Sequence, residues 1–115
     1  MPEHSFDFTV EGQLLTDVGG TLPQPVLSTP GMVAMMERAA TVCSAEQLDG
    51  RGFTVGFEIC VKHIGASFEG ATCTATAVLR EVVEDRKFRF DVEVREGERL
   101  IGVGTHERRV PRPSP

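Results

Sequence analysis

The sequence predicts an α+β fold in which a curved antiparallel β-sheet wraps around one long central helix. Residues 27–43 are apolar around almost their whole helical circumference, which is typical of a helix enclosed by other elements. One strand-like segment precedes this helix and four follow it, joined by short polar turns, and this order favours an antiparallel sheet with a single helix. With 115 residues, of which 40% are apolar and 25% charged, the chain has the size and composition of one globular domain.

The N-terminal part consists of a strand and a loop. Phe6, Phe8 and Val10 alternate with other residues at the period of a half-buried strand. Residues 12–28 then mix glycine, proline and apolar residues without a period. We expect this segment to be an ordered loop that covers part of the molecule as a lid.

The helix is expected to begin at Thr29 and Pro30 and to end near Cys43. A threonine hydroxyl can cap the free amides of a helix start, and proline suits the first helical position because no donor is needed there. Glu37 lies in the apolar middle of this helix. A carboxylate in such a place costs free energy unless it is paired, so its presence needs a structural or a chemical reason.

Four strands are expected after the helix, near residues 53–63, 71–83, 88–94 and 100–109. In the first of them every second residue is apolar, and the same parity places His63 on the face that looks at the core. The apolar residues of that face are Phe53, Val55, Phe57, Ile59 and Val61. A strongly curved sheet around one helix is the hotdog architecture, whose edge strands commonly pair between subunits, so we expect a homodimer.

We interpret residues 1–110 as one domain and the proline-rich residues 111–115 as a flexible tail. The formal net charge of −5 argues against a nucleic-acid partner, since phosphate neutralisation requires a basic surface. No run approaches the roughly 18 apolar residues of a membrane span, and the N-terminus has no basic and apolar leader. We therefore expect a cytoplasmic protein without a membrane partner.

The cysteines and histidines predict neither a disulfide framework nor a metal site. The three cysteines lack a CxxC pair and are expected to be buried free thiols. The three histidines lie on separate segments without ligand spacing. These residues are Cys43, Cys60, Cys73, His4, His63 and His106.

Three residues have the chemistry of a hydrolytic site. Thr29 and Glu37 are eight positions apart on the helix, and their directions around its axis differ by about 80°. His63 lies on a strand face that looks at this helix, so we expect a hydroxyl, a carboxylate and an imidazole to converge on one cleft. Each residue also has a structural explanation: Thr29 as a helix cap, Glu37 as the partner of an arginine, and His63 as a hydrogen-bonded histidine at a strand end.

The segments "GMVAMMERAA", "VGFEICVKHIGAS" and "GTHER" resemble the fluoroacetyl-CoA thioesterase family, a group of hotdog-fold acyl-CoA thioesterases. The resemblance extends from about Leu27 to Val110. It implies hydrolysis of acyl-CoA to a carboxylic acid and free CoA, with CoA as part of the substrate and with no cofactor. The residues that the resemblance marks as catalytic are Thr29, Glu37 and His63, with Gly56 lining the site and Arg108 beside the acyl-CoA.

Two further expectations concern how the substrate is held. A thioester carbonyl needs donors aimed at its developing oxyanion, and free amides of Gly31 and Met32 near the helix start can supply them. Arg108, alone or with Arg109 and Arg112, is expected to bind the phosphates of CoA. The alternative for these cations is a solvated, charged chain end.

The acyl specificity is expected to differ from that of the fluoroacetyl-specific enzyme. That enzyme places phenylalanine side chains in the loop before the helix as a hydrophobic lid, whereas the stretch here is "GGTLPQPVL", with no aromatic residue. An aliphatic pocket selects acyl groups by fit, which favours larger groups over acetyl. Two other functions are alternatives. A non-catalytic hotdog protein that binds acyl-CoA or an apolar ligand has little reason to bury a carboxylate, and a hotdog hydratase or dehydratase would be distinguished by Thr29 at the helix start.

Overall fold

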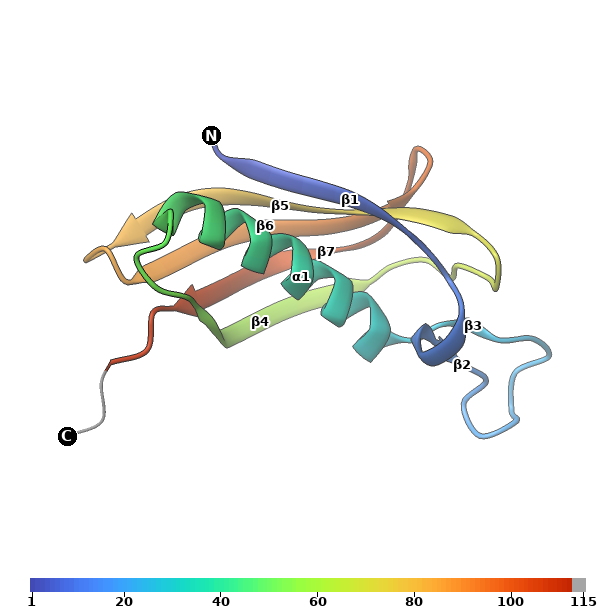
Figure 1. The fold of residues 1–115 in the computed structure, drawn as a ribbon. Coiled ribbons are helices and arrows are strands. Elements are labelled where there is room, and N and C mark those ends of the chain that lie inside the picture. The colour runs from blue at the N-terminus through green and yellow to red at the C-terminus, as the bar shows by residue number, and fades with distance from the viewer. Residues whose placement is uncertain (113–115) are drawn as a thin grey trace.

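Five antiparallel strands form a curved sheet, and one helix lies against its concave face (Figure 1). The computed structural model describes residues 1–112. The sheet order is β1-β5-β6-β7-β4, which confirms the predicted α+β fold of an antiparallel sheet around one helix. The elements are β1 (Glu3–Thr9), the 3₁₀ helix η1 (Gly12–Leu14), β2 (Leu15–Thr16), β3 (Val26–Leu27), α1 (Thr29–Leu48), β4 (Val55–His63), β5 (Thr72–Val83), β6 (Lys87–Glu96) and β7 (Arg99–Arg109).

Ser28 caps the N-terminus of α1. Its hydroxyl accepts a hydrogen bond from the Gly31 amide at 2.9 Å, and Pro30 lies in the first turn. The prediction that Thr29 makes the cap is therefore wrong, because two neighbouring residues can both act as caps and the local pattern does not choose between them. The Thr29 hydroxyl is consequently free to contact another residue.

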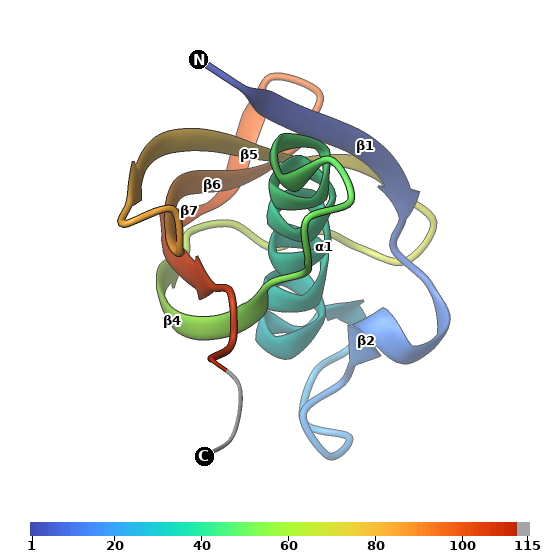
Figure 2. The ribbon, with the colours of Figure 1, turned by 60° about the vertical axis from the view of Figure 1, so that its left-hand side comes forward.

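The helix is longer than predicted, and within residues 1–112 one of its sides is not covered by other elements. It continues beyond Cys43 to Leu48 and stops where Asp49 adopts the left-handed conformation, with φ of 48°. The sheet curves around one side of α1 only (Figure 2), and Ala34 and Thr41 on the other side are exposed. The apolar circumference seen in the sequence therefore includes a stripe that one chain leaves uncovered.

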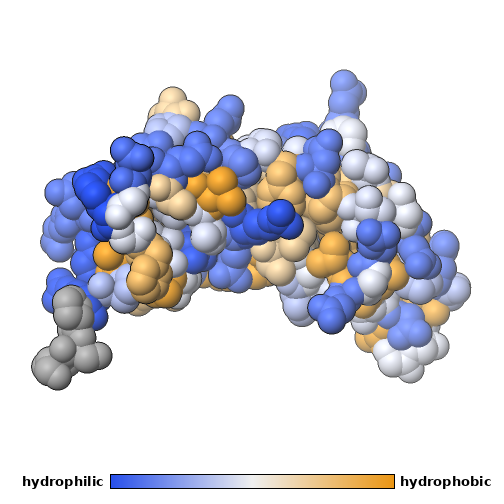
Figure 3. Space-filling view, viewed as in Figure 1, coloured by the Kyte–Doolittle hydropathy of each residue, from blue (hydrophilic) through white to orange (hydrophobic). Residues whose placement is uncertain are grey.

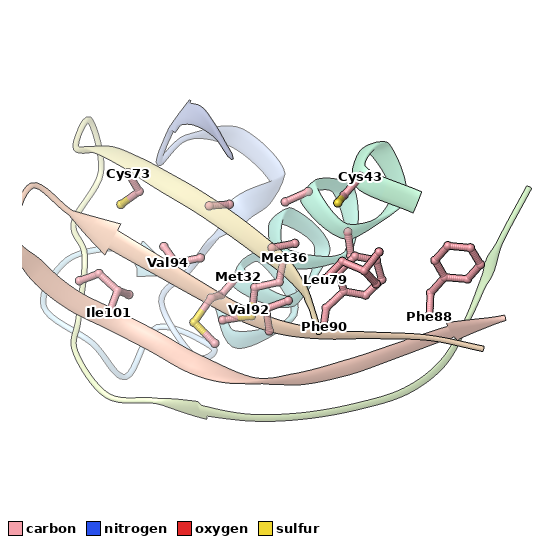
Figure 4. Packing of buried hydrophobic residues seen from close by; sticks show 14 of the residues in the cluster. Met32, Met36, Cys43, Cys73, Leu79, Phe88, Phe90, Val92, Val94 and Ile101 are labelled. Carbon is pink, nitrogen blue, oxygen red and sulfur yellow. The ribbon is translucent and has the colours of Figure 1, made fainter. Parts of the chain in front are cut away.

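The hydrophobic core fills the space between α1 and the sheet. Figure 4 shows Met32 and Met36 of the helix gathered with Phe90 and Val92 of β6. Each large apolar side chain buried in this way stabilises the fold by roughly 1.5–3 kcal/mol. Small residues on the facing strand β5 let the helix approach the sheet closely. The buried residues of β5 are Cys73, Ala75, Ala77 and Leu79.

A β-bulge divides β4 into two parts, because its register with β7 shifts between Gly56 and Glu58. The extra residue exchanges the two faces of the strand, so the predicted parity is correct only after the bulge. The residues that face the helix side there are Ile59, Val61 and His63. The prediction is wrong for Phe53 (63% exposed), Val55 (45%) and Phe57 (56%). The space-filling view in Figure 3 shows apolar side chains at the surface over the start of β4.

The segment before α1 is ordered, as predicted for a covering loop. β2 and β3 form a two-stranded ribbon in which Leu15 pairs with Leu27. The Leu27 amide donates to the Ser67 carbonyl at 2.8 Å, and Val26 forms an isolated bridge with Phe68. These contacts attach the loop to the connection between β4 and β5.

The three cysteines are free thiols. Cys43 and Cys73 are buried as predicted, but Cys60 is exposed because it lies on the edge strand β4, so the prediction is wrong for this residue. Within residues 1–112, no helix has both the length and the apolar character needed to cross a membrane. Three residues of the predicted tail at 111–115, residues 113–115, lie outside the described residues.

Candidate active site

Thr29 and His63 meet at the N-terminal end of α1. The Thr29 hydroxyl lies 2.8 Å from Nδ1 of His63, the last residue of β4. This contact is available because Ser28 makes the helix cap. Nε2 of His63 is buried and has no hydrogen-bond partner among residues 1–112. An imidazole beside a hydroxyl is an arrangement that activates the hydroxyl, or a water molecule bound to it, as a nucleophile.

The environment of His63 keeps its imidazole neutral near pH 7. Burial lowers the pKa of His63 below the ordinary value of 6.5, because water no longer stabilises the charged form. A neutral imidazole has one nitrogen with a free lone pair. That nitrogen can accept the proton of Thr29, so the pair can act as a general base.

The hydroxyl and the imidazole border an apolar pocket of about 300 Å³. The large apolar side chains Val18 and Ile64 at this pocket are 57% and 56% exposed. A pocket of this kind has room for a small apolar group beside the hydroxyl and the imidazole. Its other lining residues come from the segment before α1 and from the connection between β4 and β5 and are Thr16, Val26, Leu27, Ser28, Gly65 and Ala66.

Glu37 lies in a second cluster, with Gly56 and Arg108. Its Oε2 is 3.5 Å from Nη1 of Arg108, and the Glu37 side chain is 41% exposed. A Cβ on Gly56 would lie 2.9 Å from the same Oε2, which real contacts essentially never show. A side chain at this position would displace the carboxylate, so the glycine lets Glu37 lie against the backbone of β4. A smaller pocket of about 180 Å³ adjoins this cluster and is lined by Glu37, Gly56, Phe57, Glu58, Ile59 and His106.

Arg108 is buried behind Glu37, and its guanidinium is held by several partners. Nε donates to the Thr54 hydroxyl at 2.9 Å and Nη2 donates to the Thr54 carbonyl at 3.0 Å. Nη1 lies 3.3 Å from Nε2 of His106. Burial lowers the pKa of Arg108, and the negative charge of Glu37 opposes this effect. The charge in the middle of the helix is therefore paired with a buried cation.

The two clusters are far apart within one chain. Thr29 and Glu37 are separated by about 12 Å along the helix axis, and Gly56 and His63 by about 23 Å along β4. The expected convergence of Thr29, Glu37 and His63 on one cleft is therefore wrong for a single chain. Their directions around the helix are compatible, but the rise along its axis separates Glu37 from the other two.

Residues 10–112 match the family model of the fluoroacetyl-CoA-specific thioesterases. The chain belongs to this family. It is 41% identical over 85 residues to the fluoroacetyl-CoA thioesterase of Streptantibioticus cattleyicolor, and the match spans 74% of this chain but only 60% of the length of that relative. The solved structure of the fluoroacetyl-CoA thioesterase FlK has a TM-score of 0.82 at 33% identity, over 95% of this chain and 84% of FlK. A variant of FlK in complex with fluoroacetate and CoA has a TM-score of 0.83 at 32% identity, over 95% of this chain and 91% of that one.

In this member of the fluoroacetyl-CoA-specific thioesterase family, the amides at the helix start are not free. The Gly31 amide donates to the Ser28 hydroxyl at 2.9 Å, and the Met32 amide donates to the Ser28 carbonyl at 2.9 Å. The expectation that these two amides are free to bind an oxyanion is therefore wrong, because the cap satisfies them. Gly31 has a packing role, since a Cβ there would lie 3.0 Å from the Leu14 carbonyl oxygen.

Arg108 of this family member does not belong to an exposed cationic patch. It is 6% exposed, and its donors face other buried groups and Glu37. The expectation that Arg108 binds the phosphates of CoA is wrong, because a phosphate cannot reach an enclosed guanidinium. The neighbouring Arg109 is also engaged: its guanidinium lies 3.3 Å from the centre of the Phe57 ring, and Nε donates to Glu107 at 2.6 Å.

Sequence reasoning missed His106 and Thr54 as parts of the site. His106 is 3% exposed, and its Nδ1 lies 2.8 Å from the Glu58 carbonyl oxygen. Thr54 joins Arg108 to α1, because its hydroxyl lies 2.8 Å from that of Ser44. The signal for His106 is the alternation within "GTHER", which places it on the same face of β7 as Arg108.

Proposed function

We propose that the protein is an acyl-CoA thioesterase, which hydrolyses an acyl-CoA to a carboxylic acid and free CoA. The observation that carries this proposal is the 2.8 Å contact between Thr29 and His63 beside an apolar pocket. The family assignment supports a CoA thioester as the substrate class. In the reaction, the oxygen of water adds to the thioester carbonyl carbon, the C–S bond breaks, and a proton from water goes to the CoA thiolate.

His63 transfers the proton in this scheme. The neutral imidazole takes a proton from the attacking water through the Thr29 hydroxyl and returns it to the leaving thiolate. Glu37 supplies the carboxylate of the site, either by orienting the water or by attacking the carbonyl to form an anhydride that water then hydrolyses. Both routes release the same two products.

We propose further that two copies of the chain pair through β4 and complete two active sites between them. β4 is an edge strand with exposed apolar side chains such as Phe57, whereas the opposite edge strand, β1, alternates exposed polar residues with half-buried ones. An unprotected apolar edge favours pairing with another strand. In an antiparallel pair of β4 strands around a twofold axis, opposite ends of the strand meet. His63 of one copy then approaches Glu37 of the partner subunit, which joins the two clusters into one site.

Mixing two inactive variants tests this shared site. Glu37→Gln and His63→Ala should each lower turnover by roughly 10²-fold or more, the scale for loss of an acid–base group. In a shared site, a mixed dimer keeps one intact site, so a co-refolded equal mixture should regain about a quarter of the wild-type activity. A site built within one chain regains none. Light scattering that shows only monomer at micromolar concentration would contradict the pairing.

Release of the CoA thiol from short, branched and aryl acyl-CoAs tests the activity itself. The wild type should hydrolyse at least one of them, and Glu37→Gln should hydrolyse it roughly 10²-fold more slowly or worse. Glu46→Gln, at a carboxylate of the same helix that is 60% exposed, is the matched control and should retain turnover. Binding of acyl-CoA without thiol release would favour the non-catalytic binding protein, and hydration of an enoyl-CoA would favour the hydratase.

The free cysteines fit a reducing compartment, and on this basis we propose a cytoplasmic location. Fractionation of cells that express the tagged protein checks this. Recovery in a membrane or secreted fraction would contradict it.

A further inference from the structure

The partner of Glu37 is held by a buried polar network. The Arg108 guanidinium donates two hydrogen bonds to Thr54, from Nε to the hydroxyl and from Nη2 to the carbonyl oxygen. The Thr54 hydroxyl is in turn 2.8 Å from the hydroxyl of Ser44, on the same helix as Glu37. The remaining contact is that of Nη1 with His106, at 3.3 Å. Nη1 is also the nitrogen that pairs with the Glu37 carboxylate, so His106 and Glu37 contact the same nitrogen of Arg108.

The hydrogen bonds of His106 determine where its proton lies. Nδ1 is 2.8 Å from the Glu58 carbonyl oxygen, and a carbonyl oxygen only accepts, so Nδ1 carries the hydrogen. Nη1 of Arg108 only donates, so Nε2 must present its lone pair to it. Only the neutral imidazole can make both contacts. A protonated His106 would turn an N–H toward the guanidinium and place two positive charges side by side.

We propose that His106 is a positioning residue for Glu37: as a neutral acceptor it holds Nη1 of Arg108 against the carboxylate, and its protonation releases this contact. Turnover should therefore require neutral His106 although His106 does not touch the substrate. The inference rests on the proposed thioesterase function, in which Glu37 belongs to the site.

The surroundings of His106 support a neutral imidazole. Arg108 of β7 and Glu37 of α1 are the charged groups that face it, β4 presents the carbonyl of Glu58, and β6 presents the ring of Phe90 at 6.4 Å. Burial lowers the pKa of His106, the Glu58 carbonyl opposes this, and the charge of Arg108 lowers the pKa further. On the opposite face of the sheet, Arg89 and Glu107 pair with each other.

Two substitutions separate positioning from simple packing. His106→Gln keeps an oxygen that can accept from Arg108 but cannot be protonated, whereas His106→Ala removes the acceptor. We expect His106→Ala to lower kcat at least about tenfold with KM changed less than about threefold, and His106→Gln to retain most of kcat at pH 7.5. His4→Gln, at a partly exposed histidine on β1, is the control and should match the wild type.

The pH dependence of kcat distinguishes the two roles, because a His106 that only packs in the core would not change its acid limb. With His63 and His106 both required in the neutral form, the acid limb of log kcat should approach a slope of two in the wild type and of one in His106→Gln. An unchanged acid limb in His106→Gln would overturn the proposal.

Nitrogen-15 NMR of the imidazoles in the wild type gives a second test that needs neither turnover nor a folded variant. The proposal requires the hydrogen of His106 on Nδ1, and a spectrum with the hydrogen on Nε2 would overturn it. A wild type that hydrolyses no CoA thioester would instead refute the proposed function, and the NMR result would still stand by itself.

Discussion

Replacing Gly56 by alanine tests whether turnover depends on the position of the Glu37 carboxylate. The added Cβ would lie 2.9 Å from Oε2 of Glu37 and 3.6 Å from Nη1 of Arg108. Ordinary van der Waals contacts begin near 3.4 Å, so the carboxylate must move by at least about 0.5 Å. Glu37 and Arg108 are already 3.5 Å apart, at the long end of an ion pair, so a movement of this size alters the geometry of the pair.

The effect of this substitution on catalysis should be larger than its effect on stability. The displaced atom is the tip of a flexible side chain that is 41% exposed, so the free energy of unfolding should change by less than about 1 kcal/mol. A small misplacement of a group that acts on the substrate can cost about 10²-fold in rate. We therefore expect Gly56→Ala to lower kcat by about 10- to 100-fold.

Thiol release with the best acyl-CoA measures kcat, and urea unfolding measures stability. Val103→Ala, at an exposed position of β7, is the control for a small change in a strand and should keep kcat within about twofold. A stable Gly56→Ala protein with wild-type kcat would refute the reasoning, because Glu37 would then tolerate displacement.

Three further predictions follow from the helix cap, the buried histidine and the loop. Ser28→Ala should lower the free energy of unfolding by about 1 kcal/mol, because it leaves the Gly31 amide without its acceptor, and an unchanged urea midpoint would contradict the cap. Burial lowers the pKa of His106, so below about pH 6.5 the unfolded chain binds a proton that the folded chain does not. Stability should therefore fall with decreasing pH from about 6.5 to the folded pKa, by up to about 1.4 kcal/mol per pH unit, and urea titrations of His106→Gln should show a flatter dependence. Finally, kcat/KM should rise from acetyl-CoA to a medium-chain, branched or aryl acyl-CoA, since the pocket beside Thr29 is walled by aliphatic residues. Rates normalised to the alkaline hydrolysis of each thioester check this, and a large residual preference for fluoroacetyl-CoA would show that the aliphatic loop does not set the specificity.

The elements of the fold could be predicted from the amino-acid sequence, because hydrophobic period and turn residues are local properties. One apolar helix among five strands, with short polar turns, was sufficient for the antiparallel sheet around a helix. Local signals failed where two choices were equivalent. Ser28 and Thr29 are both capping residues, and the alternation of β4 gives no sign of the bulge at Gly56 that exchanges its faces.

The direction of His63 was also predictable, since the parity of β4 after the bulge places it on the helix side, where it contacts Thr29. The environment of Glu37, in contrast, depends on how the strands pair. Its neighbours Gly56 and Arg108 are opposite each other in the pairing of β4 with β7, between residues 52 positions apart in the chain. Such a register depends on the packing of the whole sheet, and the same packing encloses the Arg108 guanidinium that the sequence presents as one of a run of surface cations. Periodicity shows which way a side chain points, but which residues of other elements lie beside it is decided by how the elements pack together.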